Sequence, residues 1–317
     1  MAYEPLADWL PPGKRAAVVF TIDDVHPGRS ADHYDAGGDL GAGALGLVAA
    51  LLERHPYLHV TLFTTADWRE ISPTPSKLLS RVPVVRDRMY LSRVLPAGTR
   101  RIDRHPAFLD YVRAIPRTEL GCHGLHHIHP GRQLHVEFQD EPIGEHLAKL
   151  RRMLEIFDAA KLPYVRGMCP PGWNAPPALL AAMDQLGFAF VASARDIKTP
   201  ISADARTAMS GLAGAPLIQP ARVGRSLVHF ATNFQATSRW ERATAIVDAG
   251  GLLAVKGHII KDALGYVALD GIDPVYCNLL DLLFGRLHRE YGDALWWTTM
   301  GEIAQRIAAA PAVARIS

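Results

Sequence analysis

Short apolar runs rich in β-branched and aromatic residues recur along the chain, and segments of helical periodicity lie between them. The runs lie at 16–22, 58–64, 118–122, 164–169, 188–193, 226–232, 251–257 and 294–299. Strands that alternate with helices favour a parallel sheet covered on its faces, and seven or eight such units favour closure of that sheet into a barrel. The pattern therefore predicts an α/β protein built on a (β/α)7-8 barrel.

Two of the intervening helices are predicted directly by spacing. Residues 145–160 place leucine and phenylalanine side chains three and four positions apart, and residues 176–187 end at a glycine, as a helix often does. The chain has no internal repeat, no low-complexity segment and no linker rich in Gly, Pro or Ser. We therefore expect residues 1–317 to form a single domain.

One segment, at about 69–105, interrupts the alternation of strands and helices. Prolines and arginines are mixed there too irregularly for one helix, so we expect a long insertion after the second strand, at one end of the barrel. Its arginines could bind a phosphate or carboxylate of a substrate, and the alternative is a solvated basic loop. The arginines are Arg69, Arg81, Arg86, Arg88, Arg93, Arg100, Arg101 and Arg104.

Composition narrows the choice of partners and compartment. A formal net charge of +2 is too small for the basic surface that nucleic-acid binding requires. The scattered Cys122, Cys169 and Cys277 form no Cys-x-x-Cys pair and no disulfide framework. The first fifteen residues carry Glu4 and Asp8 and lack the pattern of a signal peptide, and no apolar run is long enough for a membrane span. We expect a cytoplasmic protein with neither nucleic acid nor membrane as a partner.

Polar residues that suit a metal site follow two of the predicted strands. Asp23 and Asp24 end the first, and His123 and His127 follow the third at a spacing that places both imidazoles on one side of a helical turn. An Asp-Asp pair alone is more often a helix cap, and one His-x-x-x-His alone is weak evidence. Their joint occurrence favours a site for one divalent ion, zinc first, with cobalt, nickel, manganese or iron as alternatives.

A further histidine, His258, ends the seventh predicted strand. If residues 252–258 alternate as a strand, Lys256 and His258 project to the same side. The ammonium would lower the pKa of the imidazole, and a carboxylate would oppose that effect. Asp196, at the end of the fifth predicted strand, is our candidate for this carboxylate.

These motifs together resemble the NodB-like polysaccharide deacetylases, carbohydrate esterase family 4. TIDDV (21–25) is similar to the family's Thr-Phe-Asp-Asp-Gly, and HGLHH (123–127) to His-Ser/Thr-x-x-His, with glycine in the Ser/Thr place. CPPGWN (169–174) is similar to Arg-Pro-Pro-x-Gly, and AVKGHII (254–260) to the closing strand with its catalytic histidine. The resemblance spans about 16–306, including a final WWTTMGEIAQRI, and the Asp-Asp-Val opening indicates an outlying branch.

The resemblance implies a distorted barrel and a role for each matching residue. It makes Asp24, His123 and His127 the metal ligands, Asp23 the general base and His258 the acid that protonates the leaving amine. The backbone N–H near Gly172 would stabilise the oxyanion, with Trp173 and Asn174 in the same segment near the substrate. The family arginine that orients the base falls at Cys169, so we consider Arg166 as its replacement.

The activity implied is hydrolysis of a non-peptide amide bond by metal-activated water. We expect an N-deacetylase that acts on an amino sugar or another small N-acetylated molecule of the cytosol. Two alternatives remain open at this stage. One is hydrolysis of a cyclic amide or ureide on the same barrel, and the other is a barrel that binds a ligand without turning it over.

Overall fold

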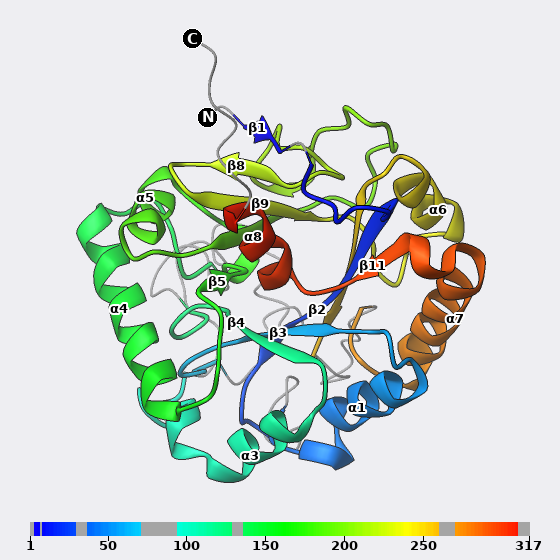
Figure 1. Ribbon diagram of the computed structural model, residues 1–317. Helices are drawn as coiled ribbons and strands as arrows, with labels where there is room; N and C mark the ends of the chain where they lie inside the picture. Colours follow the sequence, from blue (N-terminus) through cyan, green and yellow to red (C-terminus); the bar gives the residue numbers. More distant parts are fainter. Residues whose placement is uncertain are drawn as a thin grey trace, which may run out of the picture.

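The computed structural model describes residues 3–6, 8–29, 37–70, 94–128, 136–259 and 270–309. A central sheet is surrounded by helices (Figure 1). The strands are β1 (Glu4–Pro5), β2 (Ala16–Val25), β3 (Val60–Thr64), β4 (Thr118–Cys122), β5 (Gly167–Met168), β6 (Phe190–Arg195), β7 (Ser210–Gly211), β8 (Ala221–Val223), β9 (Leu227–Thr232), β10 (Leu252–His258) and β11 (Leu295–Trp297).

The described helices cover the outside of the sheet, except that the last of them along the chain lies across one end of it (Figure 1). They are α1 (Ala44–Arg54), α3 (Pro106–Ala114), α4 (Ile143–Ala160), α5 (Pro177–Gln185), α6 (Trp240–Asp248), α7 (Pro274–Tyr291) and α8 (Met300–Ala309). Short 3-10 turns lie at η1 (Leu40–Ala42), η4 (Ile102–Arg104), η5 (Pro171–Trp173) and η6 (Gly292–Ala294).

The strand order confirms the predicted barrel. Neighbouring strands run β9-β6-β5-β4-β3-β2-β10, all parallel, and β11 also lies parallel to β2. A parallel bridge from Phe234, just after β9, to Val255 in β10 joins the two ends of this order. The barrel is distorted because β9 and β10 meet only beyond the end of β9, where Phe234 N donates to Ala254 O at 3.1 Å.

Alternation along the strands separates two apolar layers. In β2, Ala17 and Val19 belong to an inner cluster, whereas Val18 and Phe20 pack outward against the helices. The helix α8 contributes Met300, Ile303 and Ala304 to the inner cluster, and it lies across one end of the barrel in Figure 1. This end is the one where the strands begin, so the opposite end, where they finish, is left for the polar residues.

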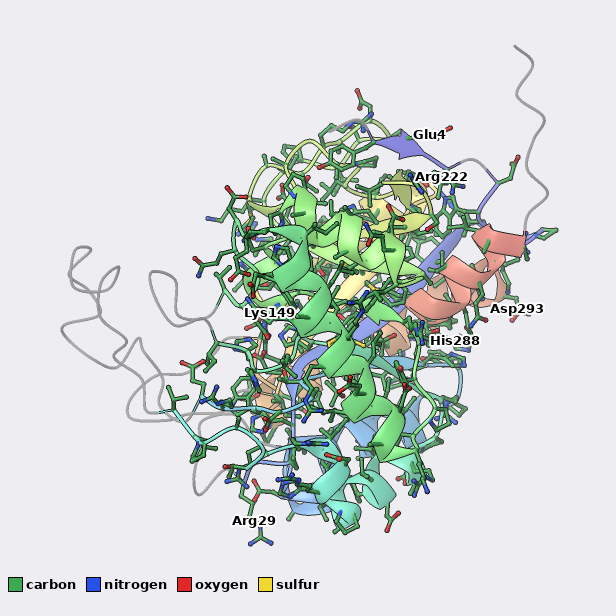
Figure 2. The ribbon with its side chains drawn as sticks, turned by 90° about the vertical axis from the view of Figure 1, so that its left-hand side faces the viewer. Glu4, Arg29, Lys149, Arg222, His288 and Asp293 are labelled. Carbon is green, nitrogen blue, oxygen red and sulfur yellow. The ribbon has the colours of Figure 1, made fainter. Side chains whose placement is uncertain are left out.

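The eight predicted strands and both predicted helices are present, with ends that move by a few residues. The sequence patterns missed β1, β7 and β8, which have only two or three residues and carry no periodic signal. Of these, β1 pairs antiparallel with β8, and Glu4 lies beside Arg222 at this edge (Figure 2). No described helix has both the length and the apolar character needed to cross a bilayer.

Most of the predicted arginine-rich insertion, residues 71–93, lies outside the described residues, with Arg81, Arg86, Arg88 and Arg93. Arg101 is described and forms an ion pair with Asp103 at 2.7 Å. The anion-binding role of this insertion and the single-domain organisation therefore remain predictions.

Candidate metal centre and catalytic pair

The three predicted metal ligands meet where β2 and β4 end. Asp24, His123 and His127 each offer a ligand atom, and these atoms all lie within 4.8 Å of one another. The Oδ1 atom of Asp24 is 2.9 Å from His123 Nε2 and 3.1 Å from His127 Nε2. All three side chains are buried, so the site is preformed inside the protein.

The backbone of β2 explains how two adjacent aspartates can face one site. Regular alternation places Asp23 on the inner side of the barrel with Ala17 and Val19. Asp24 would then point outward, but it has a φ of 63°, and the register of β2 against β3 shifts between Ile22 and Val25. Asp24 thus adopts the left-handed conformation, which aspartate adopts more readily than most residues. This conformation turns the second carboxylate back to the mouth of the barrel.

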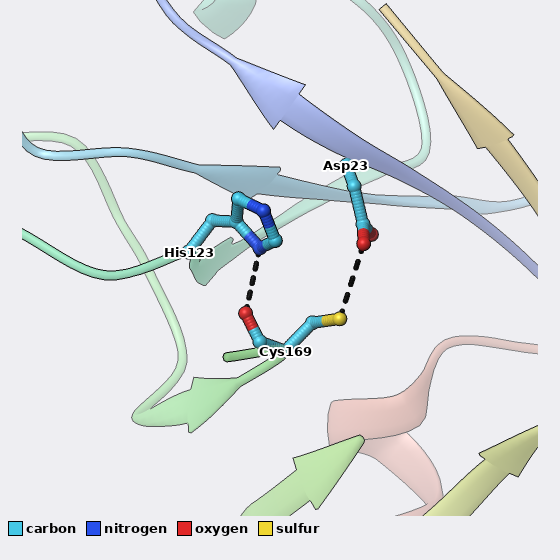
Figure 3. Close-up of side chains that lie close together, drawn as sticks. All are labelled: Asp23, His123 and Cys169. Carbon is cyan, nitrogen blue, oxygen red and sulfur yellow. Dashed lines mark hydrogen bonds between the residues drawn. The ribbon is translucent and has the colours of Figure 1, made fainter. Parts of the chain in front are cut away.

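Neighbouring groups fix the orientation of both imidazoles. His123 Nδ1 lies 2.6 Å from the carbonyl oxygen of Cys169 (Figure 3), an acceptor that requires the proton on Nδ1, so Nε2 is the nitrogen that faces Asp24 and would bind a cation. His127 Nδ1 lies 3.7 Å from the buried carboxylate of Glu70. The ring of Trp68 stacks on His127 with centroids 4.6 Å apart.

The loop that carries the two histidines is held by Glu137 and is not a helical turn. The Glu137 carboxylate accepts hydrogen bonds from the backbone N–H groups of Leu125, His126 and His127 at 3.0 to 3.2 Å. A Cβ atom on Gly124, whose φ is +80°, would lie 2.2 Å from Glu137 Oε2. The predicted helical spacing was therefore wrong about the local structure, although the two imidazoles do meet.

Charge in this cluster suits a divalent cation. Burial raises the pKa of Asp24, but His127 and His123 outweigh burial and hold this pKa well below its usual value. Burial lowers the pKa of His127, but Asp24 and Glu70 outweigh burial and raise it well above its usual value. A cation would take the place of the proton shared among these groups, and one carboxylate with two imidazoles is a donor set used by zinc and similar ions.

The other aspartate, Asp23, is held by one of its two oxygens. Asp23 Oδ2 accepts from the ammonium of Lys256 and from the Cys169 thiol at 3.1 Å (Figure 3). Asp23 Oδ1 is buried and has no hydrogen-bond partner among the described residues. Burial raises the pKa of Asp23, but Lys256, His123 and His258 outweigh burial and lower it below its usual value. The Asp23 carboxyl is thus ionised and held in place through Oδ2, and its Oδ1 atom is available to accept a proton.

A second group, Asp23 with His123 and Cys169, also has metal-ligand spacing. A thiol must lose its proton to bind a metal. Burial and the Asp23 carboxylate raise the pKa of Cys169 well above its usual value. The thiol therefore keeps its proton and donates a hydrogen bond to Asp23. Asp24 with the two histidines is therefore the better metal site.

Lys256 supplies the positive charge that the sequence led us to seek in Arg166. Arg166 instead donates to the carbonyl oxygen of Leu186 at 3.0 Å in an exposed position, away from the aspartates. Lys256 is fully buried and comes from β10, on the other side of β2 from β3. The expectation for Arg166 was wrong because the run predicted at 164–169 forms only the short strand β5, Gly167–Met168. Arg166 therefore precedes β5, at the end of the barrel opposite the aspartates.

His258 lies beside Asp23, and its partner is Asp270. The two residues His258 and Asp23 are register partners on β10 and β2. His258 Nδ1 is 2.9 Å from Asp270 Oδ2. Burial lowers the pKa of His258, but Asp270 outweighs both burial and Lys256 and raises it above its usual value. The protonated form of the imidazole is therefore favoured on the residue that pairs with Asp23 across the two strands.

The predicted pairing of His258 with Asp196 was wrong. Asp196 accepts hydrogen bonds from the backbone of Lys198, Thr199 and Ala208, so it stabilises its own loop. The register of β6 against β9 shifts between Val191 and Ala194. This irregularity reverses the alternation, so that Arg195 takes the inner side that strict alternation gives to Asp196.

The CPPGWN segment places one of its candidates at the mouth. The Trp173 ring lies 4.6 Å from Lys256 Nζ and stands edge-on to His258 at 6.1 Å between centroids. Gly172, with a φ of 64°, makes the turn that precedes it. Asn174 Nδ2 donates to the carbonyl oxygen of Phe138 at 2.5 Å, so its side chain serves the structure of this segment.

Sequence reasoning did not identify Glu137, Glu70, Trp68 or Asp270. Each is distant in the sequence from the residue it supports, and none belongs to a motif. The sequence indicated Lys256 only as a neighbour of His258. Its position within an apolar strand does predict a carboxylate partner, because a buried lysine is almost always paired.

No family model matches the sequence, and no curated protein does. Among solved structures, a protein of Mycobacterium smegmatis assigned as a polysaccharide deacetylase superimposes with a TM-score of 0.59 at 15% identity, over 98% of this chain and 95% of that one. Puue allantoinase gives 0.54 at 12% identity, over 98% and 96%. A 4-alpha-glucanotransferase of Thermococcus litoralis gives 0.50 at 11%, over 92% of this chain but 40% of its own.

Identities this low establish architecture and leave chemistry to the site itself. Two of these structures match this chain over nearly their whole length, and one of them is assigned to the group that the motifs resemble. The chain therefore has the fold of the polysaccharide deacetylases, a barrel that the allantoinase shares.

Proposed function

We propose that this protein is a metal-dependent hydrolase of non-peptide amide bonds, and that it removes the acetyl group from a small N-acetylated substrate such as an amino sugar. The observation that carries the proposal is the position of Asp23. The Asp23 carboxylate lies within metal-ligand distance of His123, one of the three residues of the Asp24, His123 and His127 cluster, and Asp23 is the register partner of His258 on the neighbouring strand. Its Oδ1 atom has no hydrogen-bond partner among the described residues. A base, an acid and a cation site thus share one mouth.

Asp24, His123 and His127 would hold the cation. A divalent ion bound there would polarise the amide carbonyl and make water acidic enough to lose a proton near neutral pH. Asp23 Oδ1 is placed to accept that proton, because Lys256 and Cys169 already occupy Oδ2.

His258 is placed to complete the reaction at the leaving nitrogen. Asp270 keeps the imidazole protonated and fixes its orientation through Nδ1, so Nε2 is the atom that donates. Water then supplies a hydroxyl group to the acyl carbon, and the nitrogen leaves with the proton from His258. Trp173 covers Lys256 and limits the access of solvent to the Asp23–Lys256 pair.

Metal content and turnover test this proposal together. We expect about one divalent ion per chain by plasma mass spectrometry, and acetate release from a panel of N-acetylated sugars and amines. His127→Ala should lose the metal. His126→Ala is the matched control, because the Nδ1 atom of His126 lies 3.1 Å from the backbone oxygen of Asp67, and His126 is not one of the three clustered ligands. Wild-type protein that stays metal-free after dialysis against Zn²⁺, Co²⁺ and Mn²⁺ would favour a barrel that only binds a ligand.

Hydrolysis of a cyclic amide or ureide is a second candidate. It is favoured by the match to Puue allantoinase over 96% of that chain. The same base, acid and cation would open a ring. Products separate the two activities, because deacetylation releases acetate and ring opening releases no second molecule.

A further inference from the structure

Arg195, the last residue of β6, brings a guanidinium group into the mouth of the barrel. Its Cζ atom lies 5.3 Å from the ring centroid of Trp173. The Oε1 atom of Gln235 accepts hydrogen bonds from Nε at 2.8 Å and from Nη2 at 2.6 Å. Gln235 is itself buried, and its Nε2 donates to Thr237 Oγ1 at 3.1 Å. One edge of the guanidinium is therefore fixed.

The opposite edge, which carries Nη1, has no hydrogen-bond or ion-pair partner among the described residues. The other cation of the mouth, Lys256, is paired with Asp23, and Asp270 is engaged by His258. Asp270 is near enough for the charge of Arg195 to help lower its pKa, but its hydrogen bond goes to His258. Arg195 is thus a partly buried positive charge with no carboxylate hydrogen-bonded to it among the described residues. A free guanidinium edge matches the two oxygens of a carboxylate better than any neutral group.

We infer that Arg195 binds a carboxylate of the substrate, so that the natural substrate is a small acyl amide with a free carboxylate. This inference rests on the proposed function. Trp173 lies near both groups, with its ring perpendicular to that of His258 and with Arg195 over its face. The Arg195 Cζ atom and the His258 ring centroid lie 5.3 and 6.1 Å from the Trp173 centroid, so a short carbon chain between amide nitrogen and carboxylate would suffice to reach both.

Binding of ligands that cannot be hydrolysed tests the inference without requiring turnover. The probes are 4-oxopentanoate, 5-oxohexanoate and 6-oxoheptanoate, in which a methylene replaces the amide nitrogen, and their neutral carboxamides. Calorimetry with the metal-loaded enzyme should give at least one carboxylate that binds about tenfold more tightly than its carboxamide, as expected for a charge-assisted hydrogen-bonded pair.

Arg195→Gln should reduce this ratio to about one, and Arg195→Lys should leave an intermediate ratio because it retains the charge without the planar fork. Arg166→Gln is the matched control and should keep the wild-type ratio, since Arg166 bonds Leu186 O at an exposed position. Equal binding of carboxylate and carboxamide to the wild type would overturn the inference. A preference that persists in both Arg195 variants would do the same. Absence of turnover with a preserved carboxylate preference would count against the proposed reaction alone.

Discussion

Two carboxylates, the buried Asp23 and the half-buried Glu119, lie at opposite ends of the barrel, and their surroundings differ. Glu119, at the end closed by α8, accepts hydrogen bonds from Thr61, Thr299 and Gly301, and these occupy both of its oxygens. Burial raises the pKa of Glu119, and the hydrogen bonds only partly oppose this. Asp23, at the mouth, has a paired cation and one oxygen without a described partner. Loss of solvent acts to raise the pKa of both carboxyls, so the neighbouring cation and the free oxygen distinguish a reactive carboxylate from a structural one.

The sharpest test of this comparison replaces each carboxylate by its amide. Asp23→Asn should lower kcat by about 10³-fold, because a positioned general base contributes between about 10² and 10⁴. Glu119→Gln should change kcat by less than about threefold but destabilise the fold by about 1–3 kcal/mol, because it disturbs a half-buried group whose oxygens are both hydrogen-bonded. Steady-state kinetics and urea denaturation measure the two effects. Similar losses of kcat in both variants would remove the distinction.

Removing the ammonium group of Lys256 should raise the pKa of Asp23, as burial does for Glu119. Lys256→Met leaves the Asp23 charge buried without its ammonium partner, so the pKa of Asp23 rises and less of the ionised base is present at low pH. We expect the acid limb of kcat/KM to move to higher pH and activity at pH 6 to fall by about 100-fold. Lys198→Met, at an exposed lysine, is the control.

Cys169 offers a rescue of this variant. It follows β5 directly and donates a hydrogen bond to Asp23, at the position where the resembling family has arginine. Introducing Cys169→Arg together with Lys256→Met would return a cation to the same oxygen. Recovery of the acid limb is the expected result, and a double variant no better than Lys256→Met would indicate that charge alone is not what Asp23 needs.

Glu137 lies near the mouth but resembles Glu119 in its bonding. Its carboxylate accepts hydrogen bonds from three backbone N–H groups. Burial raises its pKa, and the nearby histidines oppose this only in part. Glu137→Gln should therefore act through the loop of His123 and His127 and weaken metal binding by about 10–100-fold, as the loss of supporting groups does elsewhere. Competition with a chelator measures this affinity, and Glu141→Gln is the control. Unchanged affinity would show that the loop does not need Glu137.

Replacing Asp270 should change the pH dependence of activity, as replacing the cation beside Asp23 does, but by a smaller factor. Asp270 supports the protonated form of His258, so Asp270→Asn lowers the pKa of that imidazole. Because the acid must be protonated to act, the alkaline limb of kcat/KM should move to lower pH, with about a tenfold loss at pH 8.5 and little change at pH 6. A parallel loss at all pH values would assign Asp270 a structural role only.

The sequence predicted the parts of this site that depend on strand ends. Asp23, Asp24, His123 and His258 each follow an apolar run whose position is obvious from its pattern, and parallel strands in a barrel must finish at one mouth. The barrel itself was predictable for the same reason.

The remaining parts depend on events that periodicity does not encode. Asp196 was assigned to the mouth because it follows the fifth predicted strand, and the register shift in β6 gave the inner side to Arg195 instead. In β2, the left-handed conformation of Asp24 turned inward a carboxylate that alternation would have placed outside. Glu137 and Asp270 come from segments between elements, where no pattern fixes the path of the chain.

The left-handed residues around the mouth also set limits on engineering. Asp24, His127 and Trp173 have φ values of 63°, 56° and 58°. β-Branched residues strongly resist this conformation, and bulky aromatics rarely adopt it. A mutational library aimed at new substrates would therefore waste most valine, isoleucine and threonine variants at position 173, whereas glycine and asparagine should keep the loop path. Selection for altered specificity is better directed at Arg195 and Gln235, whose backbones carry no such constraint.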